Sequence, residues 1–239
     1  HLLSRRQRQM CIRDRDYIHY LPGRISEHKA GAALEKKAVA QFSRSVLKKA
    51  SQVIVPTEKV EKILEGYEVK KPISVIPTGI DLQRFSGDLS KEEKQELKKK
   101  WNIPLENQVL VSVGRLAKEK NLEELLRFFA QMVREEGREK LTFLIAGDGP
   151  DRERLENLTV ELEIQDCTVF TGMISPEEVG RYYQLGDVFV CASNSETQGI
   201  TYIEALASGV PALCRKDDCL NQVVTDGYNG CLLYTSPSP

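Results

Sequence analysis

The sequence predicts an α/β fold built on a parallel, doubly wound sheet. Short apolar runs rich in β-branched residues alternate with longer segments whose apolar residues recur at helical spacing. Strands separated by helices favour parallel pairing, with the helices covering the sheet. The 239 residues, 41% of them apolar, can form a sizeable core in one large or two modest domains.

The expected elements begin at residue 29. A helix or helix pair is expected over 29–50, with basic residues beside an apolar stripe that includes Val39 and Phe42. Its basic side would either be solvated or lie against an anionic membrane. Thr57 is expected to cap the next helix. The expected strands are 52–55, 73–77, 109–113, 141–146, 168–170, 188–192 and 210–213, and the later helices are 57–64, 86–100, from near 121 to 132, 151–162, 176–185 and 199–208.

Several polar loops follow directly after these strands. Ligands of open parallel sheets bind outside the carboxyl ends of the strands, so these loops are expected to converge at one edge. They are 114–120, 147–150, 171–173 and 193–199.

The loop and helix over 193–205 carry two acidic residues, Glu196 and Glu204, on either side of Gly199. Glu196 is expected in the loop and Glu204 within the helix, so the positive helix N-terminus lies between the two carboxylates. A phosphate-linked sugar suits this arrangement. The alternative is that these are ordinary residues of a strand-to-helix turn.

The first of these loops combines Gly114 with two cations, Arg115 and Lys120. Arginine offers a planar fork to phosphate oxygens and lysine a point charge, so the pair could clamp a diphosphate. Glycine allows close backbone approach. Solvated surface charge is the alternative interpretation.

Composition argues against several other functions. Lys and Arg (34) nearly balance Asp and Glu (35), which disfavours nucleic acid as a partner. The dense charge over 94–100 is typical of a solvated surface helix. No CxxC pair is present and the three histidines lie far from the cysteines, so no metal site is expected. Cys191 and Cys214 lie in strand-like runs and are expected to be buried, which suits a reducing cytosol.

The two ends of the chain, 1–15 and 234–239, do not share the pattern of the interior. We interpret them as sequencing-adapter read-through, with disordered tails as the alternative. On the first interpretation the chain is an internal piece of a longer protein.

Several segments resemble the successive signatures of retaining glycosyltransferases of the GT-B fold, the large family that includes sucrose synthase-like enzymes. They are Val75–Asp81, Gly114-Arg115 with Lys120-Asn121, Ala146–Pro150, Phe170–Gly172, and Glu196 with Glu204-Ala205. Asp16–Tyr20 and Ser193–Tyr202 are similar to the bacterial diacylglycerol glucosyltransferases. Most relatives carry Glu-Gly-Phe-Gly where this chain has Glu196–Gly199.

The resemblance implies a role for each site residue. Arg115 and Lys120 would hold the donor diphosphate and stabilise the leaving nucleotide, without a metal. Glu196 would contact donor-sugar hydroxyls and Glu204 the ribose. In such enzymes the leaving phosphate takes the acceptor's proton; Glu196 as a covalent nucleophile is a weaker alternative. Backbone amides around Gln198, Gly199 and Ile200 would meet the phosphates or the sugar.

The resemblance further implies a hexosyltransferase of two Rossmann-like domains that moves glucose from UDP-glucose to diacylglycerol with retention. It would be a cytoplasmic enzyme, peripheral on the inner face of the cell membrane, with no tightly bound cofactor. Residues 16–83 would be the tail of the N-terminal acceptor domain and 84–233 an incomplete donor domain. The chain is therefore expected to bind nucleotide weakly and transfer nothing. The alternatives are another acceptor (a polysaccharide, another lipid or a small molecule) and a non-catalytic nucleotide-sugar-binding module.

Overall fold

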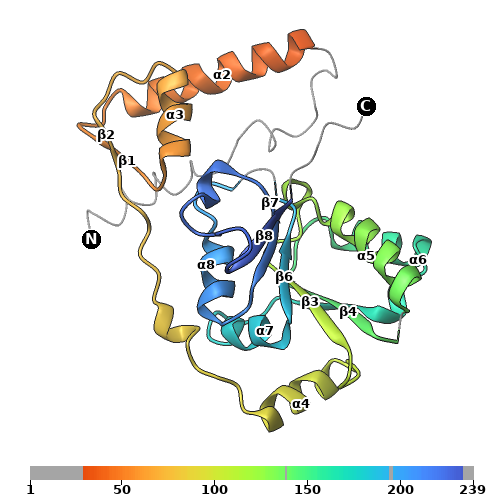
Figure 1. Cartoon of the computed structure of the whole chain (residues 1–239). Helices are drawn as coiled ribbons and strands as arrows, with labels where there is room; N and C mark the ends of the chain where they lie inside the picture. Colours follow the sequence, from red (N-terminus) through yellow and green to blue (C-terminus); the bar gives the residue numbers. More distant parts are fainter. Residues whose placement is uncertain (1–28, 138, 194–195, 234–239) are drawn as a thin grey trace. The chain divides into compact units, whose positions relative to one another are not determined.

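The computed structural model describes residues 29–137, 139–193 and 196–233. The segments 1–15 and 234–239, interpreted above as read-through, lie outside the described residues, as does Asp16–Tyr20. The described chain divides into two compact units (Figure 1). One contains the residues up to Gly79 together with 196–198, and the other contains the rest. The boundary predicted between 83 and 84 stays a prediction.

The first unit pairs two short parallel strands with two helices. Its elements are α2 (Lys29–Leu47), β1 (Val53–Val55), α3 (Glu58–Gly66) and β2 (Ile73–Val75). Val53 and Val55 are buried with Val60 of α3 in a small apolar cluster. Thr57 lies at the N-cap of α3, as expected, but its side chain makes no capping bond. The Thr57 hydroxyl donates instead to the carbonyl of Thr197, at 2.6 Å.

The second unit is a six-stranded parallel sheet, which confirms the predicted fold class. Its strands are β3 (Gln108–Val113), β4 (Leu141–Ala146), β5 (Thr168–Gly172), β6 (Val188–Cys191), β7 (Ala212–Arg215) and β8 (Gly230–Leu233). Its α-helices are α4 (Lys91–Lys100), α5 (Leu122–Glu136), α6 (Arg152–Glu161), α7 (Val179–Leu185) and α8 (Ile200–Ala207), and short 3₁₀ helices cover Leu82–Arg84, Lys118–Lys120, Gln165–Cys167 and Asp218–Leu220.

The strand order β5-β4-β3-β6-β7-β8 places the first strand of this unit in the middle of the sheet. The chain runs outward from β3 through β4 to β5, then returns to the other side of β3 and runs outward again. The winding direction therefore reverses between β3 and β6. In open parallel sheets such a switch point leaves a crevice at the carboxyl ends of the two strands.

Alternate residues of the strands pack into two apolar cores, one on each face of the sheet. One core contains Val111 and Phe189 with residues of α4, α7 and α8. The other contains Phe143 and Ile145 with residues of α5 and α6. Figure 1 shows α5 and α6 on one side of the sheet and α7 and α8 on the other. Cys191 and Cys214 are buried, as expected.

Several element boundaries differ from those predicted. The helix expected from residue 86 begins at Lys91, where Ser90 and Glu93 form a reciprocal capping box. The strand expected over 210–213 is β7, which starts after Pro211, because the Val210 N–H still bonds the Ala205 carbonyl at the end of α8. The helix expected from 176 starts at Val179, and β8 was not predicted.

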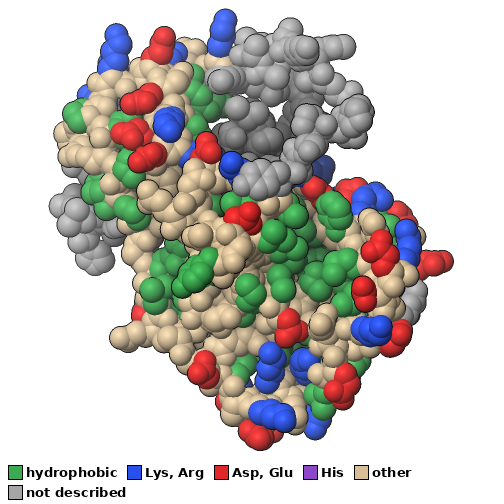
Figure 2. All heavy atoms as spheres, viewed as in Figure 1, with side chains coloured by type: hydrophobic (Ala, Val, Ile, Leu, Met, Phe, Trp, Pro, Cys, Tyr) green, Lys and Arg blue, Asp and Glu red, His purple; other side chains and the backbone are tan. Residues whose placement is uncertain are grey.

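The surface carries mixed charge. On the face drawn in Figure 2, Lys and Arg side chains are interspersed with Asp and Glu. No helix in the described part of the chain is long and apolar enough to cross a membrane.

Candidate functional site

A pocket opens at the switch point, where β3 and β6 end. Its walls come from the end of β3 and the loop after it, from the ends of β4 and β6, and from the first turn of α8. The lining residues are Ser112, Val113, Gly114, Arg115, Leu116, Lys120, Leu122, Ile145, Cys191 and Thr201. Three of the predicted site residues, Gly114, Arg115 and Lys120, are thus brought together here.

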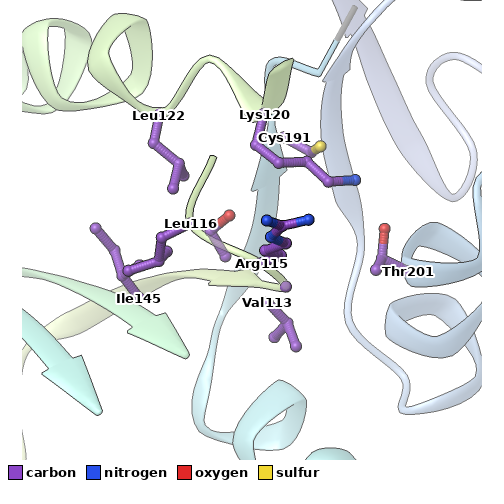
Figure 3. A pocket seen from close by; sticks show the side chains of 10 residues that line it. Val113, Arg115, Leu116, Lys120, Leu122, Ile145, Cys191 and Thr201 are labelled. Carbon is purple, nitrogen blue, oxygen red and sulfur yellow. The ribbon is translucent and has the colours of Figure 1, made fainter. Parts of the chain in front are cut away.

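Two cationic side chains line this pocket, those of Arg115 and Lys120. Figure 3 shows the Arg115 guanidinium and the Lys120 side chain converging, with Thr201 of α8 opposite them. Arg115 is exposed, and its side chain makes no hydrogen bond or ion pair with any of the described residues. Two convergent cations beside a helix N-terminus form a site suited to a diphosphate.

Close backbone packing fixes the loop that carries these cations. The Gly114 N–H donates to the Ala146 carbonyl at 2.9 Å, and the Leu116 N–H donates to the Asp148 carbonyl at 3.0 Å. Gly147 has φ +143°, and a Cβ added there would lie 1.9 Å from the Gly114 oxygen. The loops after β3 and β4 therefore converge, as predicted, and need glycine at the point of contact.

The N-terminus of α8 forms the opposite wall. Gly199 precedes the helix with φ +69°, and a Cβ there would lie 2.6 Å from the Leu220 side chain. The helix begins at Ile200, and Thr201 presents a hydroxyl from its first turn to the pocket. The first N–H groups of a helix have no intrahelical acceptor, so this wall supplies donors to an anion.

Glu204 lies further along α8 and accepts a hydrogen bond from the Tyr183 hydroxyl at 2.9 Å. Tyr183 is fully buried, and its ring packs edge-on against Phe189, with the ring centroids 5.6 Å apart. Burial raises the pKa of the Glu204 carboxyl above its ordinary value of 4.5, while the Tyr183 hydrogen bond and the charge of Arg84 oppose this. A buried tyrosine therefore orients the carboxylate.

This pKa shift predicts a pH dependence of stability. A raised pKa in the folded state contributes stability that is complete below the ordinary pKa and is lost as pH rises through the raised value. We expect the free energy of unfolding of the native protein, relative to Glu204→Gln, to fall as the pH rises above about 4.5. Urea titrations of both proteins across this range would measure it. A difference that stays level or grows with pH would contradict the shift.

Glu196 and Gln198, both predicted site residues, are described with the first unit. The Lys59 ammonium donates to the Glu196 carbonyl at 2.7 Å. The Gln198 side-chain amide pairs with both backbone groups of Thr78, accepting from its N–H and donating to its carbonyl, each at 3.1 Å. The segment 196–198 is thus held by its backbone and by the Gln198 side chain.

Two residues at or near this site escaped the sequence reasoning. Thr201 lies within the segment already singled out, so its place in a first helical turn was a usable signal. Tyr183 gave none, because it is 21 residues from Glu204 in sequence and only the packing of α7 on α8 joins them. Within the described ranges, no three His, Cys, Asp or Glu residues are grouped so as to hold a metal ion.

Comparison with known protein families identifies the family to which the chain belongs. The family described as "Glycosyl transferases group 1" matches residues 93–239, which is more than half of the chain. The chain belongs to this family. Residues 17–84 match "Glycosyltransferase Family 4". The group 1 match contains the whole switch-point pocket, from Ser112 to Thr201.

Two curated relatives of this group 1 glycosyltransferase have the same name. The alpha-monoglucosyldiacylglycerol synthase of Streptococcus pneumoniae is 39% identical over 220 residues, 92% of this chain and 48% of that protein. The enzyme of the same name from Acholeplasma laidlawii is 35% identical over 216 residues, 90% of this chain and 53% of that protein. The chain thus spans about half the length of these relatives.

Solved structures share the fold of this group 1 glycosyltransferase. The crystal structure of Anabaena HepE in complex with UDP-glucose matches with a TM-score of 0.73 at 19% identity, covering 82% of this chain and 54% of that one. Sucrose-phosphate synthase from Thermosynechococcus elongatus matches with a TM-score of 0.70 at 24% identity, covering 90% of this chain and 51% of that one. At these identities the likeness shows the fold alone.

Proposed function

We propose that this protein is a retaining glucosyltransferase that moves glucose from UDP-glucose to diacylglycerol. The observation that carries the donor half of the proposal is the convergence of Arg115 and Lys120 on a pocket faced by the first turn of α8. When glucose is transferred from a nucleoside diphosphate, the bond between its anomeric carbon and the phosphate oxygen breaks, and negative charge develops on the departing diphosphate. Cations and helix N–H groups aimed at that charge stabilise it as it develops.

We propose a role toward the same donor for each of the remaining predicted residues. Glu204, oriented by Tyr183, would accept hydrogen bonds from the ribose hydroxyls, and the carboxylate of Glu196 would contact the sugar. The amides of Gln198, Gly199 and Ile200 would meet the phosphates or the sugar. The leaving phosphate would take the proton of the acceptor on the same sugar face, so that the configuration is retained and the protein supplies no metal or base.

The acceptor half rests on the relatives and on α2. Two synthases named for monoglucosyldiacylglycerol cover about nine-tenths of the chain. On α2, Phe42 and Val46 are 58% and 43% exposed, and Lys37 of α2 and Lys48 and Lys49 directly after it are also exposed. An apolar strip beside lysines binds an anionic lipid surface. We therefore propose a peripheral position on the inner face of the cell membrane.

The thermal midpoint of the chain tests the donor site. Ligand that binds only the folded state raises this midpoint. We expect a rise with UDP and UDP-glucose, a smaller one or none with ADP-glucose and GDP-mannose, and loss of the rise in Glu204→Ala. Glu161→Ala, an exposed carboxylate at the far end of α6, is the matched control and should keep it.

Two results would oppose the proposal. A cooperative melt that ignores every nucleotide would count against the donor site. A rise with ADP-glucose or GDP-mannose alone would support a nucleotide-sugar site but exclude UDP-glucose as the donor.

The 239-residue chain is expected to transfer no glucose, since it spans about half the length of the synthases. Transfer of radiolabelled glucose to dioleoylglycerol in vesicles by this chain would overturn that expectation.

A second acceptor class has one observation in its favour. A D-inositol 3-phosphate glycosyltransferase of Corynebacterium jeikeium is 30% identical over 210 residues, 85% of this chain. The same donor site could therefore serve a small soluble acceptor. Assaying the full-length protein with diacylglycerol vesicles and with inositol phosphate, each with UDP-glucose, separates the two.

A further inference from the structure

In the second unit a charge-assisted contact joins the end of β7 to α5, and we name it the Arg215 bridge: Arg215, Glu124 and Asn121. The Arg215 guanidinium, at the end of β7, donates from one nitrogen to both carboxylate oxygens of Glu124 on α5, at 2.7 and 2.8 Å. The Asn121 side-chain amide donates to the same carboxylate. Two donors from distant parts of the chain, Arg215 and Asn121, thus meet on the carboxylate of Glu124.

Asn121 is the residue directly after Lys120, and its backbone conformation joins the turn that carries Lys120 to α5. It has φ 51° and ψ 37°, ends the 3₁₀ turn Lys118–Lys120 and precedes α5. The Asn121 N–H bonds the Lys118 carbonyl at 3.1 Å, and the Lys120 N–H bonds the Ala117 carbonyl at 2.9 Å. The left-handed conformation is uncommon for residues other than glycine, and it persists only where the surrounding structure stabilises it.

The Arg215 bridge is well placed to hold this turn. The side chains of Arg215 and Glu124 are 26% and 29% exposed, so water and salt screen them less than a surface pair. The Ser193 hydroxyl, just past β6, donates to the Glu119 carbonyl at 3.4 Å. The turn carrying Lys120 is therefore tied to the carboxyl ends of β6 and β7, two strands of the rigid sheet.

We propose that Arg215 is a positioning residue for Lys120: through Glu124 and Asn121 it holds the Lys120 ammonium in the pocket, ready for the donor diphosphate. This inference rests on the proposed function, because Lys120 matters only if a phosphate binds there. The competing interpretation is that the Arg215 bridge merely fastens α5 to the sheet. The two differ in one respect. Only a positioning role couples Arg215 to Lys120 in nucleotide affinity.

A double-mutant cycle measures that coupling. The affinity of the chain for UDP is measured by calorimetry in the native protein, Arg215→Met, Lys120→Met and the double variant. We expect Arg215→Met to weaken UDP binding about tenfold when Lys120 is present. The same substitution should have little effect on UDP binding in the Lys120→Met background. Arg215→Lys, which keeps a charge for Glu124, should recover part of the loss. Arg127→Met removes a surface ion pair of α5 with Glu123, 2.9 Å long, and should leave UDP affinity unchanged.

Additive losses in the cycle, or no loss in Arg215→Met, would overturn the positioning role while leaving the donor site intact. A native chain that binds no UDP would instead count against the proposed function. In that case amide hydrogen exchange decides the inference. Exchange at 119–121 should speed up in Arg215→Met but not in Arg127→Met, and equal exchange in both would refute it.

Discussion

Replacing Lys120 by methionine is expected to weaken UDP binding by about 10- to 100-fold. A hydrogen bond to a charged group contributes about 1.5–3 kcal/mol, and each 1.4 kcal/mol is about tenfold in affinity. Lys120 and Arg115 are the two cations lining the switch-point pocket, so Arg115→Met should show a loss of similar size. Calorimetric titration with UDP measures both.

Lys118 provides the matched control for this experiment. It lies in the same 3₁₀ turn as Lys120, is exposed, and is absent from the pocket lining. Lys118→Met should bind UDP as the native protein does. If Lys118→Met and Lys120→Met lost UDP affinity equally, general electrostatic attraction would explain the result. The proposal that Lys120 contacts a phosphate specifically would then be wrong.

Replacing Gly147 by alanine is expected to destabilise the second unit by about 4 kcal/mol. Its φ of +143° strains any other residue, and the new Cβ would lie 1.9 Å from the Gly114 oxygen. Backbone strain and overpacking each cost about 1–3 kcal/mol, and backbone cannot move aside as a flexible side chain can. Because Gly114 begins the loop of Arg115, UDP binding should weaken as well. Chemical denaturation and calorimetry measure the two effects.

Gly209→Ala separates strain from collision. Gly209 also has positive φ, +75°, but a Cβ there would meet no heavy atom of the described residues within 4 Å. It should cost about 1–2 kcal/mol from backbone strain alone and should not change UDP affinity. Equal destabilisation by the two substitutions would show that the close approach of the two loops is not important for stability.

Much of the second unit was predictable from local pattern. The strand expected over 141–146 is β4 without change, and the helix expected from near Asn121 is α5, beginning one residue later. An apolar run or a helical stripe is a property of consecutive residues, and burial of the matching face selects it. The loops of interest were also predictable, since every parallel strand ends at the same edge.

Element ends depended on details that hydrophobic spacing does not carry. The helix expected from 86 starts at Lys91 because Ser90 caps it, and Thr57 uses its hydroxyl on Thr197 rather than on its own helix. In the second case a partner 140 residues away in sequence competes with the local bond. Sequence reasoning could weigh only the local choice.

The sequence by itself determined the parallel α/β class, the family signatures and the loop on which Arg115 and Lys120 lie. The tertiary structure alone decided that β3 lies beside β6, so that this loop meets the first turn of α8 at a switch point. It also decided that Tyr183 orients Glu204 and that Arg215 reaches Glu124 from 91 residues away. The physical reason is that strand order and side-chain partners follow from how complete layers pack. Hydrophobic periodicity shows which face of an element is buried, but not which other element packs against that face.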